Sequence, residues 1–363
     1  MRANKKALLL TLLLSITWCT SHAHAGERTR PVVLDRPAVT IKHPDKGFLL
    51  AAARAGNRLV AVGEKGLIVL SDDQGATWRQ AREVPASVLL TDVAFANDTS
   101  GWAVGHLGVV LHTEDGGETW SRQLDGIQAA QLVLAEAVHH STAGTASSVD
   151  QPLDALTSAQ NLVADGPDKP FLSLSIRGAR EVLVAGAYGL MYRTVNGGLS
   201  WTSENSAQVN PGSLHFYALT QSQGPLYVAG EQGLLLSSED GKRFRALQQP
   251  YEGTLFGAVV TKNSDVLAFG LRGNLVRSSD HGQSWSRIES GVSASLQASE
   301  ILDDGAVVLG SDNGQIIVSR DGGEKFSPLA QSNQPVADIL QLSREKLLVV
   351  GPLGVEIVQL EAK

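Results

Sequence analysis

The stretch "VVLHTEDGGETWSRQ", residues 109–123, joins a short apolar run, an acidic loop around a glycine pair, and a tryptophan. The same order of features recurs in "VLSDDQGATWRQ", "MYRTVNGGLSWTSE", "LLSSEDGKRFRAL", "LVRSSDHGQSWSRI" and "IIVSRDGGEKFSPL". One such loop would be weak evidence for any fold, but six copies along one chain indicate a repeating architecture. We call these loops the acidic turns, and they span residues 71–78, 113–120, 194–201, 238–244, 278–285 and 319–326.

A second landmark precedes each acidic turn: an apolar run that ends in glycine, two or three further residues, and another glycine. It occurs seven times, and its first glycines are Gly63, Gly105, Gly186, Gly230, Gly270, Gly310 and Gly351. The intervals between these glycines are 42, 81, 44, 40, 40 and 41 residues. Five of the six intervals therefore match one propeller blade of about 40 residues. The residues between the two glycines of each copy are called the hairpin tips.

Each repeat divides into four short strands. In the second repeat they are "LTDVAFAN" (90–97), "GWAVG" (101–105), "GVVLHT" (108–113) and "TWSRQL" (119–124). A four-stranded unit of this size cannot bury both of its faces alone, so neighbouring units must stack, and radial closure protects the sheets. The sequence predicts an all-β fold, in which residues 26–363 form one seven-bladed β-propeller of four-stranded antiparallel blades.

Ring closure is predicted from what the seventh repeat lacks. Residues 354–363 supply its third strand and a tail, with no fourth strand after them. The N-terminal part of the chain offers an unassigned extended stretch, "PAVTIK" (37–42). We therefore expect a strand within residues 32–42 to complete blade 7 and close the ring.

The 81-residue interval predicts an insertion between blades 2 and 3, over residues 127–165. An eighth blade would fit the length, but this segment has neither the glycine-bounded hairpin nor an acidic turn. Instead, "IQAAQLVLAEAVHH" and "LDALTSAQNLVADG" have helical spacing, with a linker between them. The adjacent His139 and His140 do not share a helix face, so we expect surface histidines, no metal site and no cofactor.

Residues 1–25 have the pattern of a secretory signal: "MRANKK", a short apolar core, and "AHA" before Gly26. Cleavage near Ala25 would remove three of the 30 basic residues and leave 27 against 37 acids, a net charge of −10. Nucleic acid is then excluded as a partner. Cys19, the only cysteine, would also be removed. We expect a periplasmic or secreted monomer that can associate peripherally with a membrane.

The acidic turns resemble the Asp-box of bacterial neuraminidase repeats. The positions that carry this resemblance are Asp73, Trp78, Asp115, Trp120, Asn196, Trp201, Asp280, Trp285, Asp321 and Phe326. In the fourth copy we expect Glu239 at the acid position. Together with the "GWAVGxxG" run, the whole mature chain resembles the photosystem II assembly and stability factor family. This resemblance implies a non-catalytic, exported propeller that assists a membrane-protein complex. In a non-photosynthetic bacterium the client would be a resistance-nodulation-division exporter.

A glycosidase or glycan-binding propeller is the alternative, because sialidases share these repeats. The sialidase pattern requires a Phe/Tyr-Arg-Ile-Pro motif, which is absent, and only Tyr251 followed by Glu252 imitates its nucleophile pair. An acid position that accepts Asn196 also suits a turn better than a catalytic group. We expect the acids of these turns to accept backbone N–H bonds and their tryptophans to pack between blades.

Binding is predicted at the hairpin tips, on the face opposite the acidic turns. Their mixture of aromatic, apolar and charged residues is typical of an interaction surface, although exposed tips also vary without functional reason. The insertion opens on the same face, and long insertions are commonly functional. The residues predicted to bind a partner are Glu64, Lys65, His106, Leu107, Tyr188 and Arg272.

Overall fold

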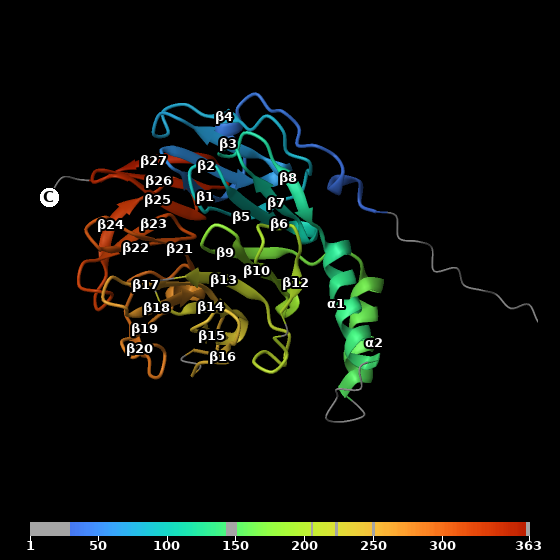
Figure 1. The fold of residues 1–363 in the computed structure, drawn as a ribbon. Coiled ribbons are helices and arrows are strands. Elements are labelled where there is room, and N and C mark those ends of the chain that lie inside the picture. Colours follow the sequence, from blue (N-terminus) through green and yellow to red (C-terminus); the bar gives the residue numbers. More distant parts are fainter. Residues whose placement is uncertain (1–29, 143–150, 205, 222–223, 249–250, 361–363) are drawn as a thin grey trace, which may run out of the picture. The chain divides into compact units, whose positions relative to one another are not determined.

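The computed structural model describes residues 30–142, 151–204, 206–221, 224–248 and 251–360 (Figure 1). Within them, strands form seven antiparallel sheets in chain order, and the predicted seven-bladed propeller is confirmed. Blades 1 to 3 are β1 (Leu49–Ala55), β2 (Arg58–Gly63), β3 (Ile68–Ser71), β4 (Arg79–Gln80); β5 (Leu90–Phe95), β6 (Gly101–Gly105), β7 (Val110–Thr113), β8 (Ser121–Leu124); and β9 (Phe171–Arg177), β10 (Glu181–Gly186), β11 (Met191–Thr194), β12 (Thr202–Ser203).

The remaining four blades follow the same order. They are β13 (Phe216–Gln221), β14 (Leu226–Gly230), β15 (Leu235–Ser238), β16 (Arg245–Ala246); β17 (Leu255–Val260), β18 (Val266–Gly270), β19 (Leu275–Ser278), β20 (Ser286–Ile288); β21 (Leu296–Ile301), β22 (Val307–Ser311), β23 (Gln315–Ser319), β24 (Ser327–Gln331); and β25 (Asp338–Ser343), β26 (Lys346–Gly351), β27 (Gly354–Gln359). The first strand of each blade contacts the first strand of the next, so these seven inner strands surround the axis.

The core lies between the blades, because alternate side chains of a strand point to opposite faces of its sheet. In β6, Trp102 and Val104 pack toward blade 3, whereas Ala103 packs toward blade 1. The buried apolar residues form seven clusters, and each cluster fills the space between two neighbouring blades. The second strands are almost continuously buried because they are covered on both faces.

The predicted N-terminal closing strand is wrong. Residues 32–42 contain a short 3-10 helix, η1 (Val32–Leu34), and no strand, and among the described residues blade 7 has three strands. Main-chain bonds tie this segment to the loop before blade 2, from Ala38 N to Val84 O (3.0 Å) and from Ser87 N to Val33 O (2.9 Å). The segment thus packs beside blades 1 and 2. Its extended sequence pattern did not indicate which blade it would contact.

Blades 7 and 1 close the ring by direct packing of their faces. Leu348 and Val350 of β26 share one apolar cluster with residues of blade 1. The Asp338 carboxylate accepts the backbone N–H of Ala52 at 2.9 Å, and the Arg54 guanidinium donates to the Gln341 carbonyl. A second 3-10 helix, η2 (Pro44–Lys46), also contacts β27. Closure therefore needs no exchanged strand, because side chains of the two inner strands join the seam.

The predicted insertion is a pair of helices, α1 (Gly126–Thr142) and α2 (Gln151–Asp165), which contact each other (Figure 1). The N-terminus of α1 is capped by Asp125, whose Oδ1 accepts the N–H groups of Ile127 and Gln128, both at 3.1 Å. Ala129 is buried between blades 2 and 3. In the described part of the chain, neither helix has the length and apolar character that a membrane span needs. The predicted signal, residues 1–25, lies outside the described residues.

Candidate functional site

The acidic turns share one set of hydrogen bonds. In the second copy, the Thr113 hydroxyl donates to Asp115 Oδ1 (2.8 Å), the Gly117 N–H donates to the Thr113 hydroxyl (3.0 Å), and the Thr119 N–H donates to Asp115 Oδ1 (2.9 Å). The first, third, fifth and sixth copies repeat these three bonds. The third copy does so with Asn196 as acceptor. The acids are thus occupied in holding the turn.

The fourth copy corrects one expectation. Asp240, and not Glu239, accepts the Ser238 hydroxyl (3.1 Å) and the N–H groups of Lys242 (2.9 Å) and Arg243 (2.8 Å). The fourth turn is one residue shorter than the others. Its bonding acid is nevertheless two positions after the serine, as in the other copies, and it accepts backbone N–H groups in the same way. Bonds of this kind lower the pKa of the turn acids, and for Asp73 the side-chain bond from Thr77 contributes most to a value of about 2.

Four of the acidic turns also join their blade to the preceding one. The Arg58 guanidinium reaches the Gly116 carbonyl (3.1 Å), the Gln123 amide reaches Gly197 O (2.8 Å), and Arg277 Nε reaches Gly322 O (3.1 Å). The Arg193 guanidinium donates to Gly241 O in the same way. Trp120 is 5% exposed and belongs to the cluster between blades 1 and 2. These contacts assign the turns a part in holding the ring together.

The hairpin tips share one backbone shape but carry different side chains. Five tips place a residue other than glycine in the left-handed backbone region, at φ angles of 51 to 58°, and these residues are Lys65, Leu107, Tyr188, Gln232 and Arg272. Bulky side chains are uncommon there and cost roughly 1 kcal/mol each. Such strain is concentrated at functional sites in many proteins. The tips thus combine one backbone shape with five different side chains.

The structure brings only some of the predicted binding residues near one another. Tyr188 lies at the tip of blade 3, and the residue is 55% exposed. His106 and Leu107 form the tip of blade 2, which α1 contacts. Burial lowers the pKa of His106. Glu64 and Lys65 are at the tip of blade 1, and Arg272 is at the tip of blade 5. Tyr188 is the predicted binding residue with described ring contacts, to His215 and to the Lys169 ammonium.

An aromatic row extends from Tyr188 toward the axis of the ring. The ring centroids of Tyr188 and His215 lie 5.0 Å apart, those of His215 and Tyr217 6.4 Å, and those of Tyr217 and Phe256 5.4 Å. All three contacts are edge-to-face, the favourable arrangement for aromatic pairs. We call these four residues the aromatic row. It connects blades 3, 4 and 5 on the hairpin face.

β-Bulges place the inner end of the row. In six blades the inner strand shifts register at its second residue, next to the glycine before the tip. Tyr217 and Phe256 occupy this position in blades 4 and 5. A bulge re-aims a side chain away from the regular alternation. His215, Tyr217 and Phe256 were not among the predicted binding residues, because they lie in strands and loops outside the tips. The available signal was an aromatic at the same repeat position in "HFYAL" and "TLFGA".

A groove of about 410 Å³ lies on the other side of Tyr188, between the two helices and blade 3. Val133, Ala137 and Leu190 contribute apolar surface, and Glu136 and His140 contribute polar groups. The Glu136 carboxylate accepts the Ser203 hydroxyl and lies 3.8 Å from His140 Nε2. Tyr188 therefore stands where the groove and the aromatic row meet.

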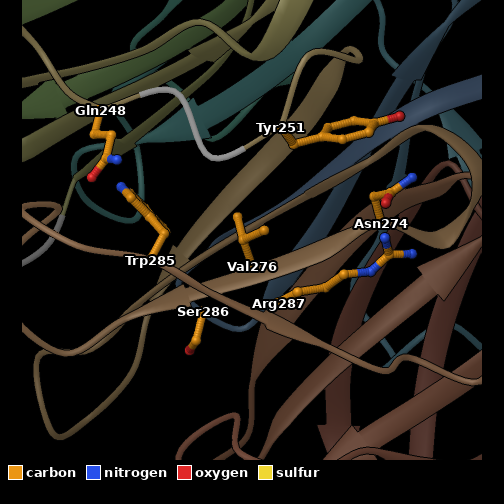
Figure 2. Close-up of a pocket in the computed structure, with 7 residues that line it drawn as sticks. All are labelled: Gln248, Tyr251, Asn274, Val276, Trp285, Ser286 and Arg287. Atoms are coloured by element: carbon orange, nitrogen blue, oxygen red, sulfur yellow. The ribbon is translucent and has the colours of Figure 1, made fainter.

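A separate cavity of about 250 Å³ lies at the junction of blades 4 and 5 (Figure 2). Its described lining residues are Gln248, Tyr251, Asn274, Val276, Trp285, Ser286 and Arg287, none of which is a carboxylic acid. Glycosidases typically need two carboxyl groups, or a comparable acid beside a tyrosine nucleophile, at the scissile bond. Tyr251 lines the cavity, and Glu252 is not among its described lining residues. The described part of the chain also holds no group of three potential metal ligands.

The comparisons with known proteins agree with this architecture. Residues 80–144, which cover blade 2 and α1, match the family described as photosynthesis system II assembly factor YCF48. A solved structure described as YCF48 bound to D1 peptide covers 90% of this chain and 97% of its own, with 16% identity and a TM-score of 0.63. The predicted resemblance to this family is confirmed. YCF48 from Cyanidioschyzon merolae matches at 16% identity over 88% of this chain and 98% of its own, with a TM-score of 0.62.

Other propellers share the fold without that resemblance. The WD40 propeller domain of Doa1 covers 91% of this chain and 97% of its own, at 9% identity and a TM-score of 0.60. No curated protein sequence matches the chain. At such low identities the structural matches establish the fold alone.

Proposed function

We propose that the chain is an exported, non-catalytic propeller that binds a segment of a membrane-protein complex on its hairpin face and assists assembly of that complex. The match of residues 80–144 to the YCF48 family carries this proposal. That family and the two YCF48 structures favour photosystem II over an exporter as the client. One of those proteins binds a D1 peptide, which supports a segment of a membrane protein as the ligand class.

The distribution of constrained side chains supports the hairpin face as the binding surface. The acids of the acidic turns are engaged within the turns, and arginine and glutamine side chains bind the same loops from the neighbouring blades. On the hairpin face, Tyr188 is exposed beside the groove that the helices form with blade 3. A face with open aromatic and apolar surface is better suited to recognition than one whose polar groups already have partners.

The proposal is tested by affinity capture in the native host with a tagged chain. We expect photosystem II reaction-centre subunits among the captured proteins. A variant in which a short Gly/Ser linker replaces residues 135–157 should fold but lose them, because Ala129 and the buried base of the insertion remain in place. Capture that survives this deletion and is lost instead on mutation of the acidic-turn face would contradict the placement. Failure of the intact chain to capture any such subunit would contradict the function.

A further inference from the structure

The aromatic row is flanked by negative charge. Glu231, at the tip of blade 4, accepts the His215 backbone N–H at 2.9 Å, and its other oxygen lies 3.5 Å from His215 Nδ1. Burial, and then the charge of Glu231, raise the pKa of Tyr217, so this carboxylate acts on the phenol as well. The side chains of His215 and Glu231 are each 30% exposed. A ligand on the row would therefore meet aromatic rings and a carboxylate together.

One end of the row already holds a cation. The Lys169 ammonium lies 5.2 Å from the centroid of the Tyr188 ring. The same ammonium contacts Asp165 (3.5 Å) and Asp168, so it is held over the ring by two carboxylates. Cations are attracted to the faces of aromatic rings by the ring quadrupole. At Tyr188, an aromatic ring and nearby carboxylates thus already bind a cationic side chain of the protein itself.

We propose that the aromatic row, with Glu231, binds an arginine side chain of an extended segment of the partner protein. An arginine suits this surface better than a lysine, because a planar guanidinium stacks on aromatic rings while it donates to a carboxylate. The net charge of −7 for the whole chain favours the same basic ligand. The groove beside Tyr188, with Val133 and Ala137, takes an apolar side chain of the same segment. This inference rests on the proposed function and specifies the chemistry of its ligand.

The test uses three synthetic capped heptapeptides. Each contains one leucine and two copies of a charged residue, which is arginine, lysine or glutamate, and glycines separate these residues. Binding to the full mature chain is measured by fluorescence anisotropy and calorimetry. We expect the arginine peptide to bind more tightly than the lysine peptide, with no binding of the glutamate peptide. Tyr217→Ala and Glu231→Gln should each weaken arginine-peptide binding by about tenfold. Their melting temperatures report whether the variants fold, and Phe256→Leu provides a milder second change in the row.

Asp312→Asn is the matched control. Asp312 is a tip carboxylate in blade 6, where it accepts the amide of Gln297, the residue at the bulge position. Asp312 has the same place in its repeat as Glu231, but the described contacts give it no aromatic neighbour. Arginine-peptide binding should be unchanged by this substitution. Equal loss in Asp312→Asn and Glu231→Gln would overturn the inference, as would stronger binding of the glutamate peptide or full binding by Tyr217→Ala.

Two results separate this inference from the proposed function. If the intact chain captures reaction-centre subunits and Tyr217→Ala and Glu231→Gln capture them equally well, the assignment of the row is wrong and the function stands. If the arginine peptide binds the row but the intact chain captures no such subunit, the proposed function is wrong and the ligand chemistry stands.

Discussion

The two faces of the ring are built from the same repeats but use them differently. Five acidic turns form the same three hydrogen bonds, and one accepts an asparagine in place of the acid without losing any of them. The hairpin tips repeat a backbone shape, including a left-handed residue, but carry lysine, leucine, tyrosine, glutamine and arginine at that position. Conserved bonding marks a scaffold. Different side chains on a shared backbone shape allow the tips to recognise a ligand. Tyr188 and the other residues of the aromatic row form a contiguous surface of this kind.

The largest expected effect tests the scaffold side of this comparison. Trp120→Ala should lower the free energy of unfolding by about 3 to 5 kcal/mol, because it opens a cavity between blades 1 and 2. Chemical denaturation measures the change. Asp115→Asn is the control, and it should cost less than about 1 kcal/mol, since the natural Asn196 keeps every bond of the turn. A turn acid with a direct functional role would instead give a stable Asp115→Asn protein that has lost partner capture.

The second test concerns the seam between blades 7 and 1. Desolvation by burial, and then the nearby carboxylates Asp92 and Glu300, raise the pKa of Asp338 to about 7, against the bonds from Ala52 and Ile339 that lower it. A carboxyl group whose pKa is higher in the folded protein than in the unfolded chain favours folding when protonated. Its stabilising effect is complete below about pH 4 and is lost as the pH rises to about 7.

We therefore expect the free energy of unfolding to fall by up to about 4 kcal/mol between pH 4 and pH 7, from Asp338 alone. Asp338→Asn should flatten this part of the profile, because the amide does not ionise. Denaturation at a series of pH values measures it, with the exposed Asp98→Asn as control. An unchanged slope in Asp338→Asn would show that the seam acid ionises as freely in the folded protein as in the unfolded chain.

The smallest effect is expected at the hairpin tips. Lys65 has a φ of 53°, and its side chain is 78% exposed. Lys65→Gly removes the steric cost of the left-handed conformation but adds backbone freedom to the unfolded chain, so stability should rise by at most about 1 kcal/mol. Thermal denaturation detects this change. Lys325→Gly serves as a comparison, because Lys325 lies in an acidic turn and its backbone N–H donates to Asp321. Destabilisation by Lys65→Gly would mean that this tip is held by its side chain and is part of the scaffold.

The sequence by itself determined the repeat and the number of blades, because glycines at chain reversals and the aromatic residues of the acidic turns recur at a fixed local spacing. It also located the insertion and its helices, since helical periodicity is a property of neighbouring residues. Those signals are local, and a repeated unit needs only its own residues and those of adjacent units to be recognised.

Tertiary structure alone decided three features. The N-terminal segment packs beside blades 1 and 2, through bonds such as Ala38 N to Val84 O, and adds no strand to blade 7. Asp338 joins the seam through Ala52, which is 286 residues away in the chain. The aromatic row assembles Tyr188, His215 and Phe256 from three blades. Each feature depends on pairs of residues that only ring closure or blade stacking brings together, and periodicity within one repeat carries no information about them.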